Sequence, residues 1–383
     1  MPEPAETLSP TPAWGLALAE PLRGFAGQVL ANCRRADAEV SGHFSLCGLL
    51  LRLRNLYKWE HGLPPWQEPD PAAALEWVSQ REELWLEVLG EDPQPVSLDG
   101  MSFDPFDAEA VNQRLLPQGL VYGAGRAGGL IPVFFLGRLA GREVVEGMEV
   151  FRVGAELGRD ILFLPGLRQD GRIYLRREPL AFLLWDKIAD PRKSLIPFLD
   201  LGLGGYGLER RALIANPTAA VMEALVQGEE RTVLWHELGE AAAGARAGEL
   251  LRWAVAALPG GELEHFTRGV KDLLADTCDG GRLARIIAER AMGPLGFYPA
   301  WLGGFPRLLF PEVDAAILTF ADHRDWAVVE EVRQLGLMRA RQALAGLEAL
   351  AQGGLEGEDL RLAAHADVIA PLTGGRPLPP RPE

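Results

Sequence analysis

The chain has 383 residues, of which 48% are hydrophobic and 24% are charged, and this balance excludes wholesale disorder, collagen and a coiled coil. Its 53 Asp and Glu residues outnumber its 38 Lys and Arg residues, which gives a formal net charge of −15. A surface this acidic repels phosphate backbones, so we expect no nucleic-acid partner.

The cysteines and the hydropathy pattern indicate a cytoplasmic protein without a membrane partner. The three cysteines, Cys33, Cys47 and Cys278, are too few and too scattered for a disulfide framework or a four-ligand zinc site. The first residues lack the basic region and the apolar stretch of a signal peptide. The longest uncharged run, 291–306, is interrupted by seven Gly and Pro residues and is too short for a membrane-spanning helix.

The chain is expected to begin with a flexible tail over 1–12 and a helical region over 13–95. Ser41 is predicted to cap a helix that stops at Gly62, and Asp70 and Pro71 form a favourable start for the next helix. Apolar residues on one face of that second helix give it the stripe of an amphipathic helix. These residues are Leu75, Val78, Trp85, Leu86 and Leu89.

A mixed α/β region with antiparallel hairpins is expected over 96–210. Residues 131–154 are predicted as extended segments around turns at Gly137 and Gly141, and Asp170-Gly171 predicts a hairpin turn. Residues 155–164 and 179–190 are predicted as short helices. The expected fold class is therefore α+β, predominantly helical, with a small antiparallel sheet in the middle of the chain.

A C-terminal helical region is expected over 211–353, with a tail over 354–383. Asn216 and Pro217 are predicted to start its first helix. Residues 293–312, rich in Gly, Pro and aromatic side chains, are expected to form a long connector. The predicted helices are 217–243, 246–257, 262–279, 282–292 and 325–350.

The sharpest local motif is His236-Glu237-Leu238-Gly239-Glu240. His236 and Glu240 are four residues apart, so they share one helix face and can bind one metal ion, while Glu237 can act as general base. The motif resembles the zincin metalloprotease sequence H-E-x-x-H, with Glu240 at the place of the second histidine. In a helix unbroken from 217 both ligands are buried, whereas a break at Gly228 would make the motif a charged surface.

A second candidate string places His265, Asp272 and Asp276 at positions i, i+7 and i+11 of a helix. Together with His236 and Glu240 these side chains make a set of nitrogen and oxygen ligands suited to zinc, iron or manganese. The alternative is that the acidic stripe is solvated or pairs with Arg268 and Lys271. The apolar residues of the opposite face predict the core side: Leu263, Phe266, Val270, Leu273 and Leu274.

Four strings of this sequence resemble those of a bacterial protein family of unknown function. They are LRNLYKWEHGLPPW, WHELGE, VKDLLADT and LGFYPAWLGGFPRLLFPE, and the resemblance extends from about residue 40 to 340. It implies one integrated architecture and carries no activity across to this chain.

Three functions remain open from the sequence. The first is a metal-dependent hydrolase of a small-molecule or peptide substrate, in which Glu237 activates water and His236, Glu240, His265, Asp272 and Asp276 supply the metal ligands. The second is a non-enzymatic helical scaffold or interaction module, since the 10 Trp residues suit partner surfaces. The third is a non-haem iron redox protein with the same ligands.

Overall fold

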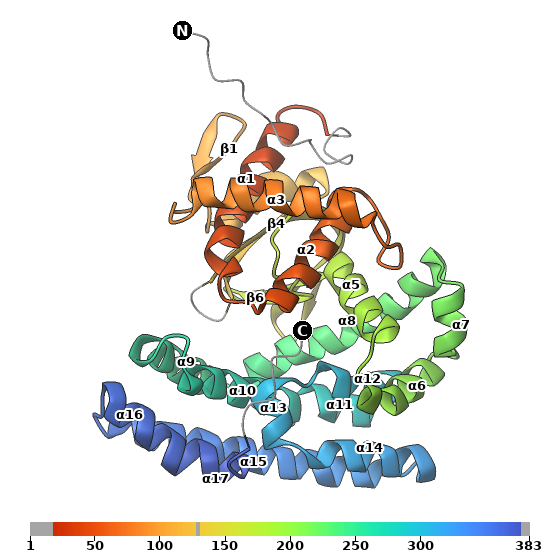
Figure 1. Cartoon of the computed structure of the whole chain (residues 1–383), viewed down its shortest axis with the longest axis vertical. Helices are drawn as coiled ribbons and strands as arrows, with labels where there is room; N and C mark the ends of the chain where they lie inside the picture. Colours follow the sequence, from red (N-terminus) through yellow and green to blue (C-terminus); the bar gives the residue numbers. More distant parts are fainter. Residues whose placement is uncertain (1–17, 128–130, 377–383) are drawn as a thin grey trace. The chain divides into compact units, whose positions relative to one another are not determined.

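The computed structural model describes residues 18–127 and 131–376, which form two compact units (Figure 1). The first unit contains the described residues up to Pro165 and Gln169–Phe182. The second contains Gly166–Arg168 and the described residues from Leu183 onward. The tail expected over 1–12 lies outside the described residues.

Three helices begin the first unit, and two of them have side-chain caps. The helices are α1 (Leu22–Ser41), α2 (Leu46–Glu60) and α3 (Pro71–Val88). Asp70 accepts a hydrogen bond from the Ala73 amide, as its predicted cap role requires. The prediction for Ser41 is wrong, because Ser45 caps α2 by accepting from the Gly48 amide and Ser41 is the last residue of α1.

The apolar stripe predicted on α3 does not form the buried face of that helix. Trp85 is buried, but Leu75, Leu86 and Leu89 are each more than half exposed. The buried face instead combines Trp85 with Arg81, which is paired with Glu60 of α2. An ion pair at a helix contact therefore shifts the buried face away from the leucines.

The main sheet of the chain is five-stranded and mixed. The remaining elements of this region are β1 (Val96–Leu98), β2 (Met101–Phe103), α4 (Ala108–Leu115), η2 (Leu116–Gln118), β3 (Leu120–Ala127), β4 (Ile131–Val145), β5 (Met148–Arg159), β6 (Gly166–Gln169) and β7 (Arg172–Arg176). The strand order is β3-β4-β5-β7-β6, and a separate antiparallel pair joins β1 to β2. β4 is antiparallel to β3 and β5, but β7 is parallel to β5. The main sheet is therefore mixed, and our prediction that it is antiparallel is wrong.

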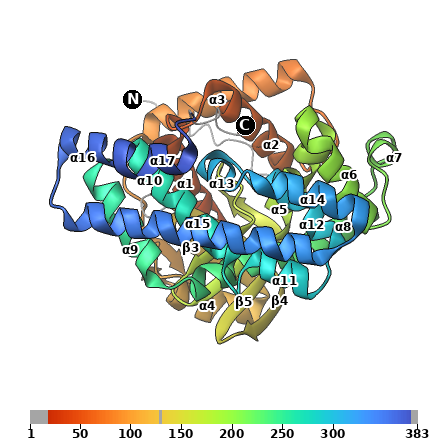
Figure 2. The same cartoon turned by 90° about the horizontal axis from the view of Figure 1, so that it is seen from below.

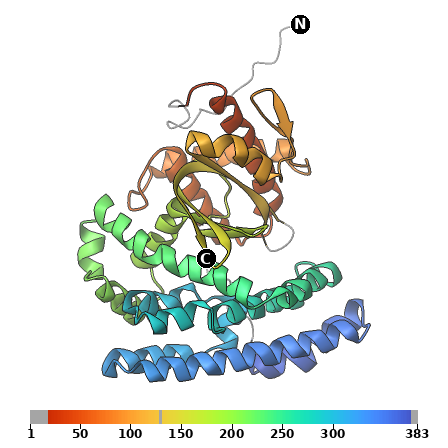
Figure 3. The same ribbon diagram turned by 180° about the vertical axis from the view of Figure 1, so that it is seen from behind.

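The main sheet curls until it is nearly closed, like a barrel (Figure 3). Register shifts between β4 and β5, beside Gly137 and Gly141, accompany this curvature. The predicted turns at these two glycines are wrong, because β4 continues through both as one strand. Residues 155–164 are likewise the end of β5 and a loop instead of a helix, whereas the Asp170-Gly171 turn is confirmed between β6 and β7.

The second unit is helical, and the predicted helices from 217 to 350 are present. The last elements are α5 (Arg177–Ala189), η3 (Lys193–Leu195), α6 (Ile196–Gly205), α7 (Arg210–Ala215), α8 (Ala219–Ala242), α9 (Ala245–Ala257), α10 (Glu262–Thr277), α11 (Arg282–Ala288), α12 (Met292–Trp301), α13 (Gly304–Leu309), α14 (Glu312–His323), α15 (Trp326–Gln352), α16 (Gly357–Ala363), η4 (Ala364–Ile369) and α17 (Ala370–Thr373). The N-cap of α8 is Thr218, which accepts from the Val221 amide, and not Asn216 as predicted. The connector expected over 293–312 contains α12 and α13, and the segment 354–383, expected as a tail, is helical over 357–373.

The core of the second unit forms around α10. α8, α9, α13 and α15 all pack against this helix, and Figure 2 shows α15 running along the length of the unit. The predicted core face of α10 is confirmed, since Leu263, Phe266, Val270, Leu273 and Leu274 are all buried. The polar face of α10 packs against α8, the helix that carries the HELGE motif.

Within the described residues, every helix is too short or too polar to cross a membrane.

Candidate metal centre

The HELGE motif lies near the C-terminal end of α8, an unbroken helix from Ala219 to Ala242. Gly228 does not interrupt this helix. A Cβ atom at Gly228 would lie 2.4 Å from the Tyr206 ring, so the missing side chain makes room for that ring. Of the two alternatives for the helix, the unbroken form is therefore correct, and His236 and Glu240 are largely buried with side-chain exposures of 19% and 13%.

α8 and α10 approach closely beside the motif because residue 239 is glycine. A Cβ atom at Gly239 would lie 2.0 Å from the backbone oxygen of Ala275 and 3.1 Å from the Cα of Gly281. Real Cβ atoms do not come this close to a backbone, so any larger residue would push the helices apart. The close contact places the side chains of the motif directly against the acidic residues of α10.

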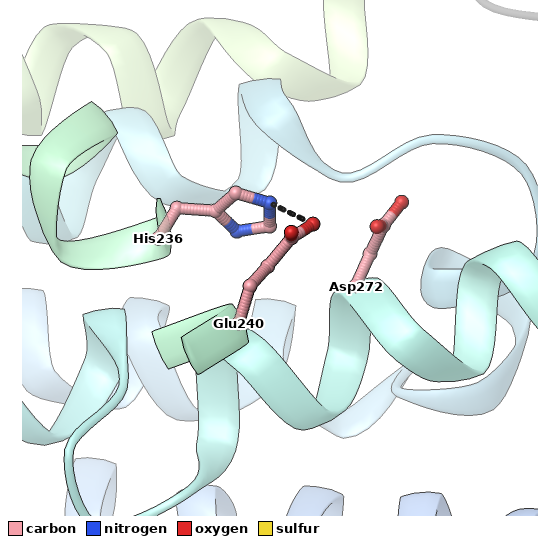
Figure 4. Close-up of side chains that lie close together, drawn as sticks. All are labelled: His236, Glu240 and Asp272. Carbon is pink, nitrogen blue, oxygen red and sulfur yellow. Dashed lines mark ion pairs between the residues drawn. The ribbon is translucent and has the colours of Figure 1, made fainter. Parts of the chain in front are cut away.

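Three ligand atoms from these two helices converge, one each from His236, Glu240 and Asp272 (Figure 4). They all lie within 4.8 Å of one another, and His236 Nε2 is 3.7 Å from Glu240 Oε1. In the described part of the chain, these three residues form the group of His, Cys, Asp or Glu side chains that is compact enough to hold a metal ion. The two sequence strings are thus brought together at one place.

Asp276 fixes the orientation of the His236 ring. Its Oδ1 is 2.8 Å from His236 Nδ1, which leaves Nε2 to face Glu240. Burial and Arg282 oppose protonation of His236, but the carboxylates of Asp276 and Glu240 outweigh them and raise the pKa of His236. Burial alone would raise the pKa of Asp276, yet Arg282 and His236 hold that pKa below its ordinary value. Asp276 is therefore an ionised partner of the imidazole.

Two cations neutralise Glu240. The Lys271 ammonium donates to Glu240 Oε1, and Arg168 Nη2 lies 3.4 Å from Oε2. Burial would raise the pKa of Glu240, but Lys271 and His236 lower it below the usual value. Asp272 differs, because burial outweighs the neighbouring Lys271 and His236 and raises the pKa of Asp272.

Glu237 lies one position further round α8 and is buried. Its carboxylate packs against Gly166, where a Cβ atom would be 2.6 Å from Glu237 Oε1. Burial, followed by the negative charge of Glu240, raises the pKa of Glu237 to about 7. A carboxyl group with this pKa can hold or accept a proton near neutral pH, which suits a general acid or base.

His265 is not one of the residues whose ligand atoms converge. Its Nδ1 is 2.7 Å from the backbone oxygen of Gly261, one turn back along α10. Of the expected side chains, the structure therefore brings together His236, Glu240, Asp272 and Asp276, with Glu237 adjacent on α8. Lys271 binds Glu240 of α8 and Arg268 binds Glu264, and neither carboxylate belongs to the acidic stripe, whose Asp276 pairs with Arg282 and His236.

Sequence reasoning missed the pairs that Lys271 and Arg168 form with Glu240 and the pair that Arg282 forms with Asp276. Lys271 carried a weak signal, because it is one of only four lysines in a chain that otherwise uses arginine. Arg168 is 72 residues from Glu240 along the chain, and Arg282 reaches Asp276 from α11. No local spacing in the sequence relates either arginine to the motif.

Fold and site together define a protein of two units with a histidine–carboxylate cluster in its helical second unit. Two sequence profiles of one family match the chain, the family of unknown function DUF6866: its N-terminal domain over residues 24–176 and its C-terminal domain over residues 181–367. The chain belongs to this family of unknown function, and the cluster falls in the C-terminal domain. No curated protein and no solved structure matches the chain.

Proposed function

We propose that this protein is a metal-dependent hydrolase in which His236, Glu240 and Asp272 bind one divalent ion. The observation that carries the proposal is the convergence of three ligand atoms within 4.8 Å, contributed by two helices that pack in direct contact. Metal–ligand bonds are about 2 Å long, so two ligand atoms on one ion lie at most about 4 Å apart. Small side-chain rotations would bring the three atoms to that separation.

The pair formed by His236 and Asp276 supports a metal ligand at Nε2. Histidines that bind metals usually donate their other ring N–H to a carboxylate, which fixes the tautomer and the ring orientation. Asp276 stands in that position at 2.8 Å from Nδ1. In this proposal Asp276 is thus a positioning residue, while one nitrogen and two carboxylate ligands are suited to zinc, iron or manganese.

Glu237 is the proposed general base. A bound divalent ion lowers the pKa of a coordinated water toward neutrality. Glu237 neighbours the ligand His236 in sequence, and its pKa of about 7 lets it accept a proton from water at physiological pH. The burial of Glu237 keeps competing solvent away from that proton.

The direct test measures metal content by mass spectrometry on protein purified without chelators. We expect one zinc, iron or manganese ion per chain in the wild type and almost none in His236→Ala or in the near-isosteric Asp272→Asn. His265→Ala is the matched control, because it removes an imidazole from α10 outside the cluster and should retain the ion.

Circular dichroism establishes that each variant is folded. Full metal retention in folded His236→Ala would refute the proposed site. A wild type that contains no metal, and takes up none when zinc or manganese is added, would favour the non-enzymatic scaffold.

A further inference from the structure

Arg168 and Lys271 are the two cations that border the proposed metal site. Lys271 binds Glu240 Oε1, the same oxygen that faces His236 Nε2, and Arg168 lies against Oε2. The Lys271 side chain is 20% exposed and that of Arg168 is 34% exposed, so both reach solvent at the rim of the cluster. Neither cation is needed to build a metal site, and each is repelled by a divalent ion held there.

The charges of the cluster are nearly balanced without an ion. Four carboxylates (Glu237, Glu240, Asp272 and Asp276) lie near three cations (Arg168, Lys271 and Arg282). With His236 neutral, as a metal ligand must be, one excess negative charge results when all four are ionised. A divalent ion would reverse this to one excess positive charge. Because an unbalanced charge in a largely buried site is unfavourable, the loaded site attracts an anion.

The ion would also release a bound ammonium. When Glu240 Oε1 becomes a metal ligand, Lys271 loses the acceptor it now uses, and its flexible four-carbon chain allows the ammonium to turn to a new one. Arg168 offers a planar fork that matches the paired oxygens of phosphate and carboxylate groups. Both cations would then lie beside the ion, where an anionic group of a substrate would bind.

We propose that the metal-loaded site binds its substrate through an oxyanion, a phosphate or a carboxylate group, and that Lys271 and Arg168 are the residues that bind it. This inference rests on the proposed metal site and narrows its substrate class from any small molecule or peptide to an anionic one. It makes Lys271 a specificity residue rather than a structural partner of Glu240.

The experiment uses the full chain loaded with one manganese ion and freed of excess metal. Inorganic phosphate and acetate are titrated into it by isothermal calorimetry, with imidazole as an uncharged metal-binding probe. We expect one oxyanion per chain to bind the loaded protein and none to bind the metal-free protein. Phosphate and acetate distinguish the two kinds of oxyanion.

Variants assign the binding to the two cations. Lys271→Met and Arg168→Met should each weaken oxyanion binding by about tenfold or more, as the loss of a charge-assisted hydrogen bond requires, and leave imidazole binding unchanged. Lys193→Met, at an exposed lysine of the same unit, is the matched control and should change neither.

The failure of this inference can be told apart from that of the metal site. If manganese binds but neither oxyanion does, or if oxyanion binding is the same in Lys271→Met, the inference is overturned and the metal site stands. If the protein takes up no metal, both proposals fail together.

Discussion

His236 and Asp276 form the contact on which the proposed chemistry of the site depends. The 2.8 Å contact at Nδ1 holds the ring so that Nε2 faces Glu240. Asp276→Asn keeps the shape of the side chain and removes its charge. We expect metal affinity to fall by about 10- to 100-fold, the usual loss for a carboxylate behind a ligating histidine, with the stoichiometry still one ion per chain. Competition titration against a fluorescent chelator measures this affinity.

Asp279→Asn is the control for this prediction. It makes the same substitution three residues further on, where the carboxylate is 83% exposed. Metal affinity should then equal that of the wild type. Equal affinity in Asp276→Asn as well would contradict the positioning role of Asp276.

The buried carboxyl group of Glu229 should make the stability of the fold depend on pH. Burial raises the pKa of this α8 carboxyl to about 7, although Tyr206 and Thr232 donate to it at 2.6 and 3.2 Å. The unfolded chain loses this proton near pH 4.5, so the folded state is favoured below that pH and loses the advantage as pH rises to about 7. The shift corresponds to roughly 3 kcal/mol.

Glu229→Gln removes this titration and can still accept from Tyr206. We compare the free energy of unfolding of the variant with that of the wild type by urea denaturation at pH 5 and at pH 8. The difference, variant minus wild type, should be larger at pH 8 than at pH 5. Glu223→Gln, at an exposed position of the same helix, should show no such change. The prediction fails if Glu229→Gln shifts the free energy of unfolding equally at the two pH values.

The spacing of single residues predicted much of the site. His236 and Glu240 at i and i+4, and Asp272 on the polar face of the next long helix, are the three side chains whose ligand atoms converge. The different role of Asp276 could not be predicted, because a ligand and a partner of a ligand have the same residue type and the same helical spacing. The packing of the two helices decides that Asp276 lies at His236 Nδ1 while Glu240 lies at Nε2.

At the scale of elements, the contact between α8 and α10 assembles the site. Gly239→Ala forces a methyl group into the Ala275 carbonyl, so the two helices must separate. We expect a loss of about 1–3 kcal/mol in the free energy of unfolding, typical of overpacking, together with weaker metal binding. Gly248→Ala in α9 meets only the far end of Arg252 at 3.9 Å and should be neutral or stabilising, because alanine favours helix. Denaturant titration of both variants, with and without metal, measures the difference, and equal stabilities would contradict this account.

The helices were more predictable than the strands. The long helices from 217 to 350 follow an apolar repeat that the sequence displays directly, and their ends agree within a few residues. The strands β4 and β5 were interpreted as shorter pieces, since glycines at 137 and 141 suggest turns. In the structure those glycines lie at register shifts that bend a continuous strand. The parallel pairing of β7 with β5 depends on contacts between distant segments, which local patterns do not reveal.

At the scale of the whole molecule, the sequence predicted a mostly helical α+β protein, and the structure confirms that class while it corrects the sheet. The two units coincide closely with the two domains of the family, and the candidate metal centre belongs to the second. The first unit contains most of the curled sheet and its covering helices. The proposed chemistry is accordingly a property of the second unit, where every residue assigned to it lies, Arg168 included.

The most direct test of the metal centre is an anomalous difference map from a crystal of the protein loaded with zinc or manganese. The account predicts one peak about 2 Å from His236 Nε2 and from a carboxylate oxygen of both Glu240 and Asp272. It also predicts that Lys271 has left Glu240 in that crystal. Full loading with the peak elsewhere, or no peak among these three side chains, would contradict the central claim.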